Sequence, residues 1–189
     1  MSKFNLRAAL VVTAVAFAAP LGAGFAYAEM TKMVGGAPMY PSKNIVQNAV
    51  HSKDHTTLVA AVKAAGLVPT LEGAGPFTVL APTNAAFSKL PAGTVQTLLK
   101  PENKGMLTGI LTYHVISGRM SAADLAKKIE EGGGHYSVNT VAGGALSFSK
   151  MGNGISVTDA KGGTAMVTIP DVNQSNGVIH VINAVLLPG

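Results

Sequence analysis

The sequence of 189 residues contains no cysteine and no tryptophan, and it has only nine acidic residues. Without cysteine the chain has no disulfide, no thiol nucleophile, no cysteine-held metal and no cysteine-based lipid anchor. With so few acids, no close pair of carboxylates falls in a plausible cleft, and such pairs are common in acid–base catalysis. These absences argue against an enzyme.

Motifs of known catalytic chemistry are also missing. The chain has no Gly-x-Ser-x-Gly elbow, no phosphate-binding glycine loop and no His-Glu-x-x-His pattern. His51 and His55 lie four residues apart beside Asp54, but a closed zinc site needs four ligands and no third one is near, so solvated loop histidines are the preferred interpretation. We expect no metal centre, no cofactor and no enzyme activity. A hydrolase assembled from distant residues is the remaining catalytic hypothesis.

The N-terminus has the pattern of a secretory signal peptide. Lys3 and Arg7 precede an apolar run over residues 8–19, and Ala26-Tyr27-Ala28 is a small-x-small cleavage site. The run is shorter than the roughly 20 residues that span a membrane. We therefore expect residues 1–28 to be removed between Ala28 and Glu29, and a periplasmic or secreted protein that spans no membrane.

The mature charge gives no sign of nucleic-acid binding. Cleavage removes two of the 14 basic residues and none of the nine acids, which leaves a net charge of +3. The lysines are dispersed, and Arg119 is the one arginine left for bidentate contacts.

Residues 29–40 contain Gly35-Gly36 and Pro38 without apolar periodicity, so we expect a flexible leader there. This leader contains three methionines, and methionine thioethers bind Cu(I). Because no histidine or cysteine accompanies them, a disordered arm is the preferred interpretation of the leader. Its methionines are Met30, Met33 and Met39.

The remaining chain, residues 41–189, changes from helical to strand periodicity along its length. We expect one helix after a cap at Ser42, a second from Asp54 to Gly66, and two more within 94–99 and 101–111. A further helix is expected after Ser121, where the sequence has the pattern of a capping box. Strands are expected at 113–116, 136–141, 145–148, 155–158, 166–169 and 178–187, with glycine-rich turns between the later ones. Helices first and strands last predict an α+β domain.

The stretch from Phe77 to Phe87 changes structure halfway. Phe77 to Leu80 reads as a strand that Pro82 ends. Thr83 is placed to cap a short helix, and Phe87 on that helix is expected to point back into the core.

This stretch resembles the first signature of the fasciclin domain, an extracellular adhesion module. The segment Ile110–Ile116 resembles the family's central Tyr-His motif, and Asn176–Pro188 resembles its closing strand. The resemblance covers residues 41–189. It implies a wedge of two mainly antiparallel β-sheets with helices packed along one edge.

The resemblance also implies candidate binding residues. In animal matrix members, the Tyr-His segment and an acidic loop before the closing strand have been linked to integrin binding, which would make Tyr113, His114 and Asp171 partner-binding. The family's pentapeptide Glu-Pro-Asp-Ile-Met is here Ile169-Pro-Asp-Val-Asn173, so integrin recognition itself is not expected.

His114 and His180 lie within apolar runs. The preferred interpretation is that both are core-edge histidines whose ring nitrogens bond to backbone or to Tyr113, because buried polar groups are normally satisfied. The alternative is that they border a ligand or partner groove.

Two functions follow from the resemblance. The first is adhesion at a cell surface or matrix, through protein or polysaccharide contacts, with weak self-association and with Asn173 as a glycosylation sequon. The second is a carrier, since some algal members bind carotenoids in a groove between helices and sheet. Met106 and other methionines would let such a groove adapt, although core filling is their ordinary use.

Overall fold

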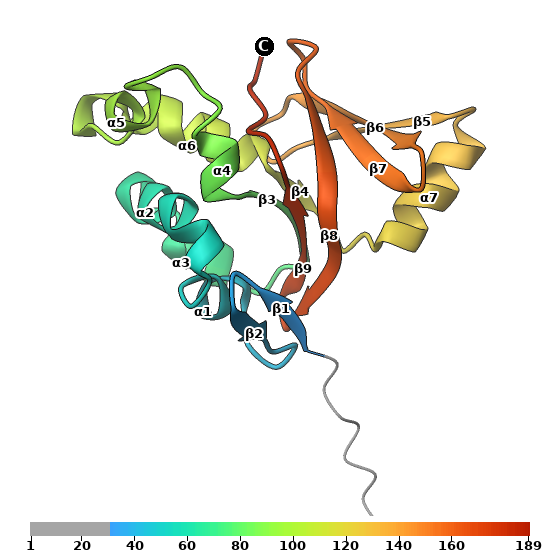
Figure 1. The fold of residues 1–189 in the computed structure, drawn as a ribbon, viewed down its shortest axis with the longest axis horizontal. Coiled ribbons are helices and arrows are strands. Elements are labelled where there is room, and N and C mark those ends of the chain that lie inside the picture. The colour runs from blue at the N-terminus through green and yellow to red at the C-terminus, as the bar shows by residue number, and fades with distance from the viewer. Residues whose placement is uncertain (1–30) are drawn as a thin grey trace, which may run out of the picture.

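A computed structural model describes residues 31–189 (Figure 1). The predicted signal peptide, with its cleavage between Ala28 and Glu29, lies outside the described residues. Within the described range, no helix is both long and apolar enough to cross a membrane.

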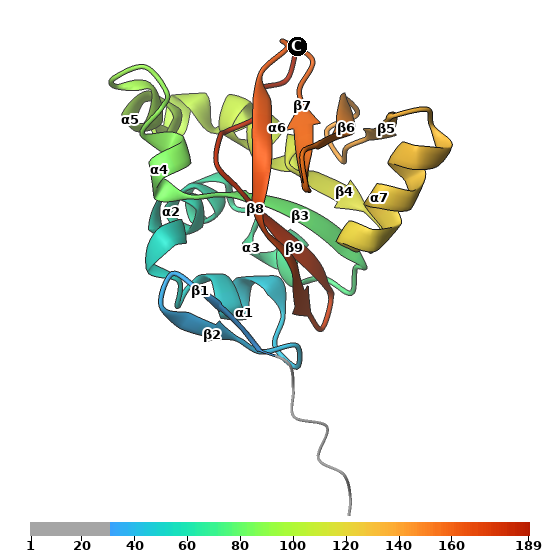
Figure 2. The same cartoon turned by 45° about the vertical axis from the view of Figure 1, so that its right-hand side comes forward.

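A seven-stranded sheet forms the centre of the fold, in the order β4-β3-β9-β8-β7-β6-β5. Its strands are β3 (Phe77–Pro82), β4 (Val115–Ser117), β5 (His135–Asn139), β6 (Ala145–Met151), β7 (Gly154–Thr158), β8 (Thr164–Gln174) and β9 (Gly177–Ile182). The β3–β9 pair is parallel and all other neighbours are antiparallel. Register shifts between Val167 and Val172 interrupt the long strand β8. Such bulges bend a strand, and the β4-β3-β9 and β7-β6-β5 halves diverge from it as a wedge (Figure 2).

Helices cover the two halves separately. Helices α1 to α6 lie beside the β4-β3-β9 half, called the β3–β9 half below, whereas α7 packs on β5 and β6 (Figure 1). The helices are α1 (Ile45–Ala49), α2 (Thr56–Ala65), α3 (Val68–Glu72), α4 (Asn84–Phe87), α5 (Thr94–Leu98), α6 (Lys104–Tyr113) and α7 (Ala122–Glu131). Two 3₁₀ turns, η1 (Lys53–His55) and η2 (Pro101–Asn103), precede α2 and α6.

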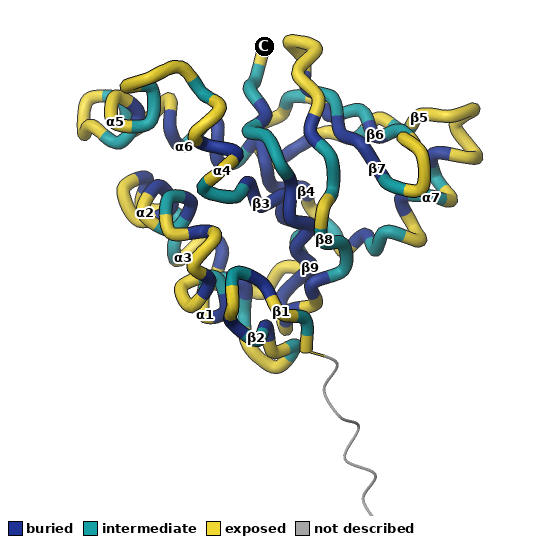
Figure 3. The backbone as a smooth tube through the Cα atoms, in the orientation of Figure 1, coloured by how far each residue is buried: buried dark blue, intermediate teal, exposed yellow. Residues whose placement is uncertain are grey.

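The core has two parts on opposite faces of β3 and β9. Val79 and Val181 belong to the part beneath α1 to α6, and Leu80 and Ile182 to the part beneath α7. Because side chains alternate across a strand, these strands are buried on both faces (Figure 3). The α+β class and the mainly antiparallel sheets predicted from the sequence are confirmed.

The flexible leader predicted for residues 29–40 is wrong from Lys32 onward. Residues Lys32–Val34 and Ala37–Met39 pair as an antiparallel hairpin, β1–β2. Gly35 and Gly36 form its turn with φ of 58° and 75°, values that a two-residue hairpin loop requires and glycine adopts without strain. Val34 and Met39 are 4% and 3% exposed, and both belong to the part of the core beneath α1 to α6. Strands of three residues are too short to show a period in the sequence.

The Tyr-His segment also differs from its prediction as a strand. Tyr113 is the last residue of α6, His114 is its C-cap, and strand β4 begins only at Val115. The final strand β9 ends at Ile182, short of the predicted Leu187.

The predicted helix caps are largely confirmed. The Thr83 hydroxyl accepts a hydrogen bond from the Ala86 N–H at 3.2 Å, and Ser121 forms a capping box with Asp124. Phe87 is buried, as predicted. Helix α1 is capped by Asn44 and not by Ser42, because the Asn44 and Gln47 side chains bond reciprocally to each other's backbone N–H.

Met39→Ala tests whether the hairpin belongs to the core. The substitution should lower the free energy of unfolding by about 2–5 kcal/mol, as expected for truncation of a buried methionine. Met33 lies on the same hairpin but is 59% exposed, so Met33→Ala should change stability by less than about 0.5 kcal/mol. Urea denaturation measures both, and equal effects of the two variants would contradict the packed hairpin.

Thr83→Ala tests the cap that follows β3. Loss of the hydroxyl should cost about 1 kcal/mol, because the Ala86 N–H loses its acceptor. Thr83→Ser retains the hydroxyl and should lose clearly less. The urea midpoints of the three proteins give the comparison, and a Ser variant as unstable as the Ala variant would argue against a capping role.

Candidate functional site

Tyr113 is fully buried, and its hydroxyl has two backbone partners. It donates to the Ala145 carbonyl at 2.7 Å and accepts from the Ala160 N–H at 3.1 Å. The ring packs so closely on Gly144 that a Cβ added there would lie 2.7 Å from it. Tyr113 therefore ties the end of α6 to the β5–β6 and β7–β8 connections, and its side chain is not available to a partner.

His114 is 2% exposed and uses both ring nitrogens. Nδ1 lies 2.8 Å from the Ile110 carbonyl, and Nε2 accepts from the Leu186 N–H at 3.0 Å. Since a backbone N–H only donates, Nε2 is the acceptor and Nδ1 carries the proton. Burial, opposed by the Ile110 carbonyl and by the charge of Asp159, lowers the pKa of His114 to about 4.

His180 and Asp171 form a second buried connection. His180 Nδ1 accepts from the Asp171 N–H at 3.2 Å, and Nε2 lies 2.9 Å from the Met120 carbonyl, to which it donates. Burial lowers the pKa of His180. The Asp171 carboxylate in turn accepts from the N–H of Ala122, the first residue of α7, at 2.7 Å.

Asp171 does not lie in a loop, as the sequence suggested, but within β8. Its φ of 54° is the one positive value among the described residues other than glycine, and aspartate tolerates this region better than most side chains. The geometry lets the backbone N–H reach His180 while the carboxylate reaches α7.

The structure therefore brings Asp171 and His180 together, and it places Tyr113 and His114 consecutively at the end of α6. His114 and His180 are both buried and bonded to backbone, as the preferred interpretation predicted. His114 also borders a cavity, as the alternative predicted, whereas His180 does not line it. Met106 is neither core nor groove, because it is 62% exposed on α6. The inward face of that helix carries Leu107, Ile110 and Leu111. Met106 is the residue before Leu107, and a step of one residue rotates the side chain around the helix axis away from that face, so Met106 points to solvent.

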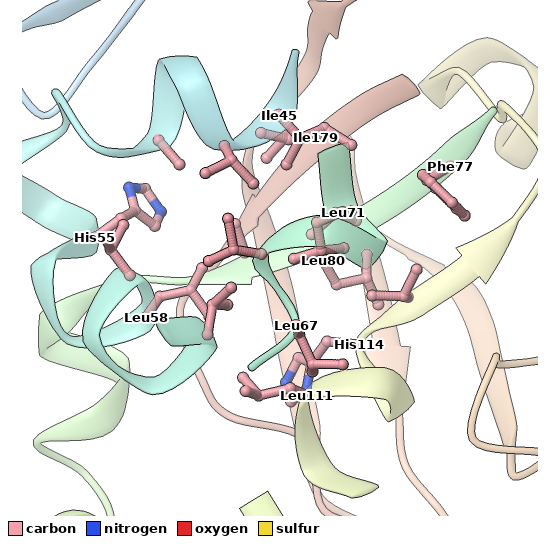
Figure 4. Close-up of a pocket in the computed structure, with 18 of the residues that line it drawn as sticks. Ile45, His55, Leu58, Leu67, Leu71, Phe77, Leu80, Leu111, His114 and Ile179 are labelled. Atoms are coloured by element: carbon pink, nitrogen blue, oxygen red, sulfur yellow. The ribbon is translucent and has the colours of Figure 1, made fainter. Parts of the chain in front are cut away.

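A cavity of about 80 Å³ lies between the helices and the β3–β9 half of the sheet (Figure 4). Apolar side chains of α1, α2, α3, β3 and β9 form most of its wall, among them Ile45, Leu58, Leu71, Val79 and Ile179. Its position matches the groove between helices and sheet that the carrier hypothesis requires.

His55 lines this cavity, contrary to the prediction of a solvated loop histidine. It is 3% exposed, and its Nδ1 lies 2.9 Å from the Ser52 hydroxyl. Its Nε2 has no hydrogen-bond partner. A signal was present in the sequence, because His55, Leu58 and Val62 have the spacing of one buried helix face. His51, by contrast, is exposed.

Burial lowers the pKa of His55, and this is the largest effect on it. The nearby Ala81 backbone and the Asp54 charge oppose the shift, although the Ala81 backbone makes no hydrogen bond of acceptable geometry with Nε2. Among the described residues, no group of three or more His, Cys, Asp or Glu side chains is placed to hold a metal ion.

The buried histidines predict a loss of stability in acid. An unfolded histidine has a pKa near 6.5, and the folded pKa of His114 is about 4, so the unfolded chain takes up the proton first as the pH falls. Stability contributed by neutral His114 is thus present above about pH 6.5 and is lost towards pH 4. At pH 5 His114 alone should cost about 2 kcal/mol. Urea unfolding at pH 8 and 5 measures this, and equal stability at both would contradict it.

Comparison with known proteins agrees with this fold. Protein sll1483 of Synechocystis sp. is 46% identical over 160 residues, which cover 85% of this chain and 82% of that protein. The cell surface glycolipoprotein MPB83 of Mycobacterium bovis is 38% identical over 122 residues, which cover 65% of this chain and 48% of that protein.

The solved structure of a FAS1 domain pair from the insect cell adhesion molecule Fasciclin I has the same fold. It matches with a TM-score of 0.69 at 20% identity, over 78% of this chain and 52% of that one. The model of the fasciclin domain matches residues 53–188. This protein therefore belongs to the fasciclin domain family.

Proposed function

We propose that the protein is a non-catalytic binding module that mediates adhesion at a cell surface or matrix, outside the cytoplasm. One observation carries the proposal: the polar side chains of the family's motifs form hydrogen bonds to the backbone inside the domain. Tyr113, His114 and His180 each have two such bonds. Groups committed in this way hold a scaffold together and are not free for proton transfer or nucleophilic attack, so the surface is what remains for function.

The proposed location has two kinds of support. The N-terminal sequence has the charge, apolar run and cleavage site of a secretory signal. One relative is named a cell surface glycolipoprotein, and the similar solved structure comes from a cell adhesion molecule.

A protein partner suits the surface better than a polysaccharide. Sugar rings usually bind by stacking on the flat faces of aromatic side chains, and Tyr40, at 37%, is the one aromatic among the exposed large hydrophobic residues of the described chain. The other exposed members are aliphatic or methionine: Met33, Val50, Met106, Val141 and Met151. Flexible methionines adapt to protein surfaces. Self-association through these residues is one form that such protein contacts take.

The cavity favours a second candidate function, the carrier. An engineered cavity of about 150 Å³ holds benzene, whereas this one measures about 80 Å³. The observed conformation thus suits a compact apolar ligand, or the end of a longer one, and not a whole carotenoid-like molecule.

Adhesion is tested with beads coated with the mature chain, residues 29–189, and cells of the source organism. We expect attachment that soluble protein competes away. Tyr113→Phe should lower the free energy of unfolding by about 1–3 kcal/mol, because it leaves the Ala145 carbonyl and the Ala160 N–H without their partner. It should nevertheless leave attachment per folded molecule unchanged.

Two outcomes would count against this proposal. Failure of the wild-type beads to attach to cells or to matrix extract at any ionic strength would remove the adhesion function. Loss of attachment in folded Tyr113→Phe protein would instead show that the Tyr-His motif itself contacts the partner.

A further inference from the structure

The Nε2 atom of His55 is an exception in the interior. It is the one buried side-chain nitrogen or oxygen without a hydrogen-bond partner among the described residues. An unsatisfied buried polar group costs free energy and calls for an explanation. Figure 4 shows the His55 ring among the apolar side chains that surround the cavity.

The proton on His55 can be located by accounting for its neighbour Ser52. Ser52 is 2% exposed, and in the described chain its hydroxyl has no hydrogen-bond partner other than His55 Nδ1, 2.9 Å away. A buried hydroxyl must direct its proton to an acceptor, so Ser52 donates and Nδ1 accepts. In the neutral ring the proton then lies on Nε2. Burial favours this neutral form by lowering the pKa of His55. His55 therefore offers the cavity a free N–H donor.

The other polar side chains of the cavity wall that are not exposed to solvent are already paired. His114 uses both nitrogens, and the Thr112 hydroxyl donates to the Thr108 carbonyl at 2.7 Å. A stable buried water needs two to four polar partners, and the apolar side chains around His55 offer none. A molecule that accepts one hydrogen bond and is otherwise apolar suits this site better than water does.

The cavity reaches the surface. Its lining residues include buried His55 and Leu58, but also Lys63, Thr70 and Val141, which are exposed. A ligand can therefore enter from solvent and extend towards the buried donor.

We propose that the cavity binds a compact apolar carbonyl compound, whose oxygen accepts a hydrogen bond from His55 Nε2. The inference rests on the carrier function proposed above and specifies its ligand class. Apolar burial supplies the affinity, and the single donor supplies the selectivity, because a hydrocarbon of the same shape leaves the donor unpaired.

The test uses two probes of the same shape, 2-pentanone and 2-methyl-1-pentene, with the isotopically labelled mature chain. Nuclear magnetic resonance titration gives the dissociation constant of each from the methyl signals of Leu58 and Val62, and it follows the Nε2 resonance of His55. We expect 2-pentanone to shift the Nε2 resonance and the alkene to leave it nearly unchanged. His55→Leu should weaken binding of the ketone relative to the alkene by about tenfold.

Two further variants serve as controls. His51→Leu removes an exposed histidine and should leave the ratio of the two dissociation constants unchanged. Val62→Leu enlarges a side chain of the cavity wall and should weaken both probes. The Nε2 resonance of the wild-type chain tests the contact even if His55→Leu does not fold.

The outcomes separate this inference from the function on which it rests. A ketone that binds without moving the Nε2 resonance, or a ratio that His55→Leu does not change, would overturn the role of His55 and leave an apolar carrier. Absence of binding by both probes to the wild-type chain would overturn the inference and the carrier function together, while leaving adhesion to its own test.

Discussion

The whole domain depends on two adjacent strands that have no face towards solvent. Strands β3 and β9 are the parallel pair of the sheet and its second and third strands, with one core cluster on each side. Every residue of β9, from Gly177 to Ile182, is buried. A buried polar group must find its partner where it lies, so the polar side chains on these two strands, Thr78 and His180, bond to the backbone around them. Thr78 shows the rule, because its hydroxyl donates to the Gly118 carbonyl at 2.7 Å and accepts from the Met120 N–H at 2.9 Å.

The same constraint gives the family's motif residues their roles. His180 lies on β9 and joins the Met120 carbonyl to the Asp171 N–H across the strand. His114 joins the last turn of α6 to the backbone at Leu186. A neutral histidine has one donor and one acceptor on opposite sides of a rigid ring, so it can connect a carbonyl to an N–H where no regular ladder runs. These residues mark the fold more directly than they mark a contact surface.

Sequence reasoning succeeded where the signal was local. Pro82 ends β3 and Thr83 caps α4 because a missing N–H and a nearby hydroxyl act within a few residues. It failed where distant residues decided the outcome. Val34 and Met39 are ordered because they fill space beneath the helices, which no period over three residues reveals. His55 is a different case, because its spacing with Leu58 and Val62 on one buried helix face was a local signal that the interpretation as a loop residue did not use.

The helices that enclose the cavity are held by polar side chains from elsewhere in the chain. Asn176 accepts from the Ile45 N–H at 3.0 Å, where α1 begins, and donates to the Leu71 carbonyl of α3 at 2.8 Å.

Asn84 fixes the third helix in a similar way. It accepts from the Thr57 N–H of α2 at 3.0 Å and donates to the Lys53 carbonyl at 2.8 Å. Three walls of the cavity are thus positioned by contacts that do not involve its contents. A site whose walls are fixed in advance spends little binding free energy on ordering. The unpaired N–H donor of His55 thus lies in a preformed cavity. Leaving this donor unpaired costs free energy, and a ligand whose oxygen accepts the hydrogen bond would remove that cost.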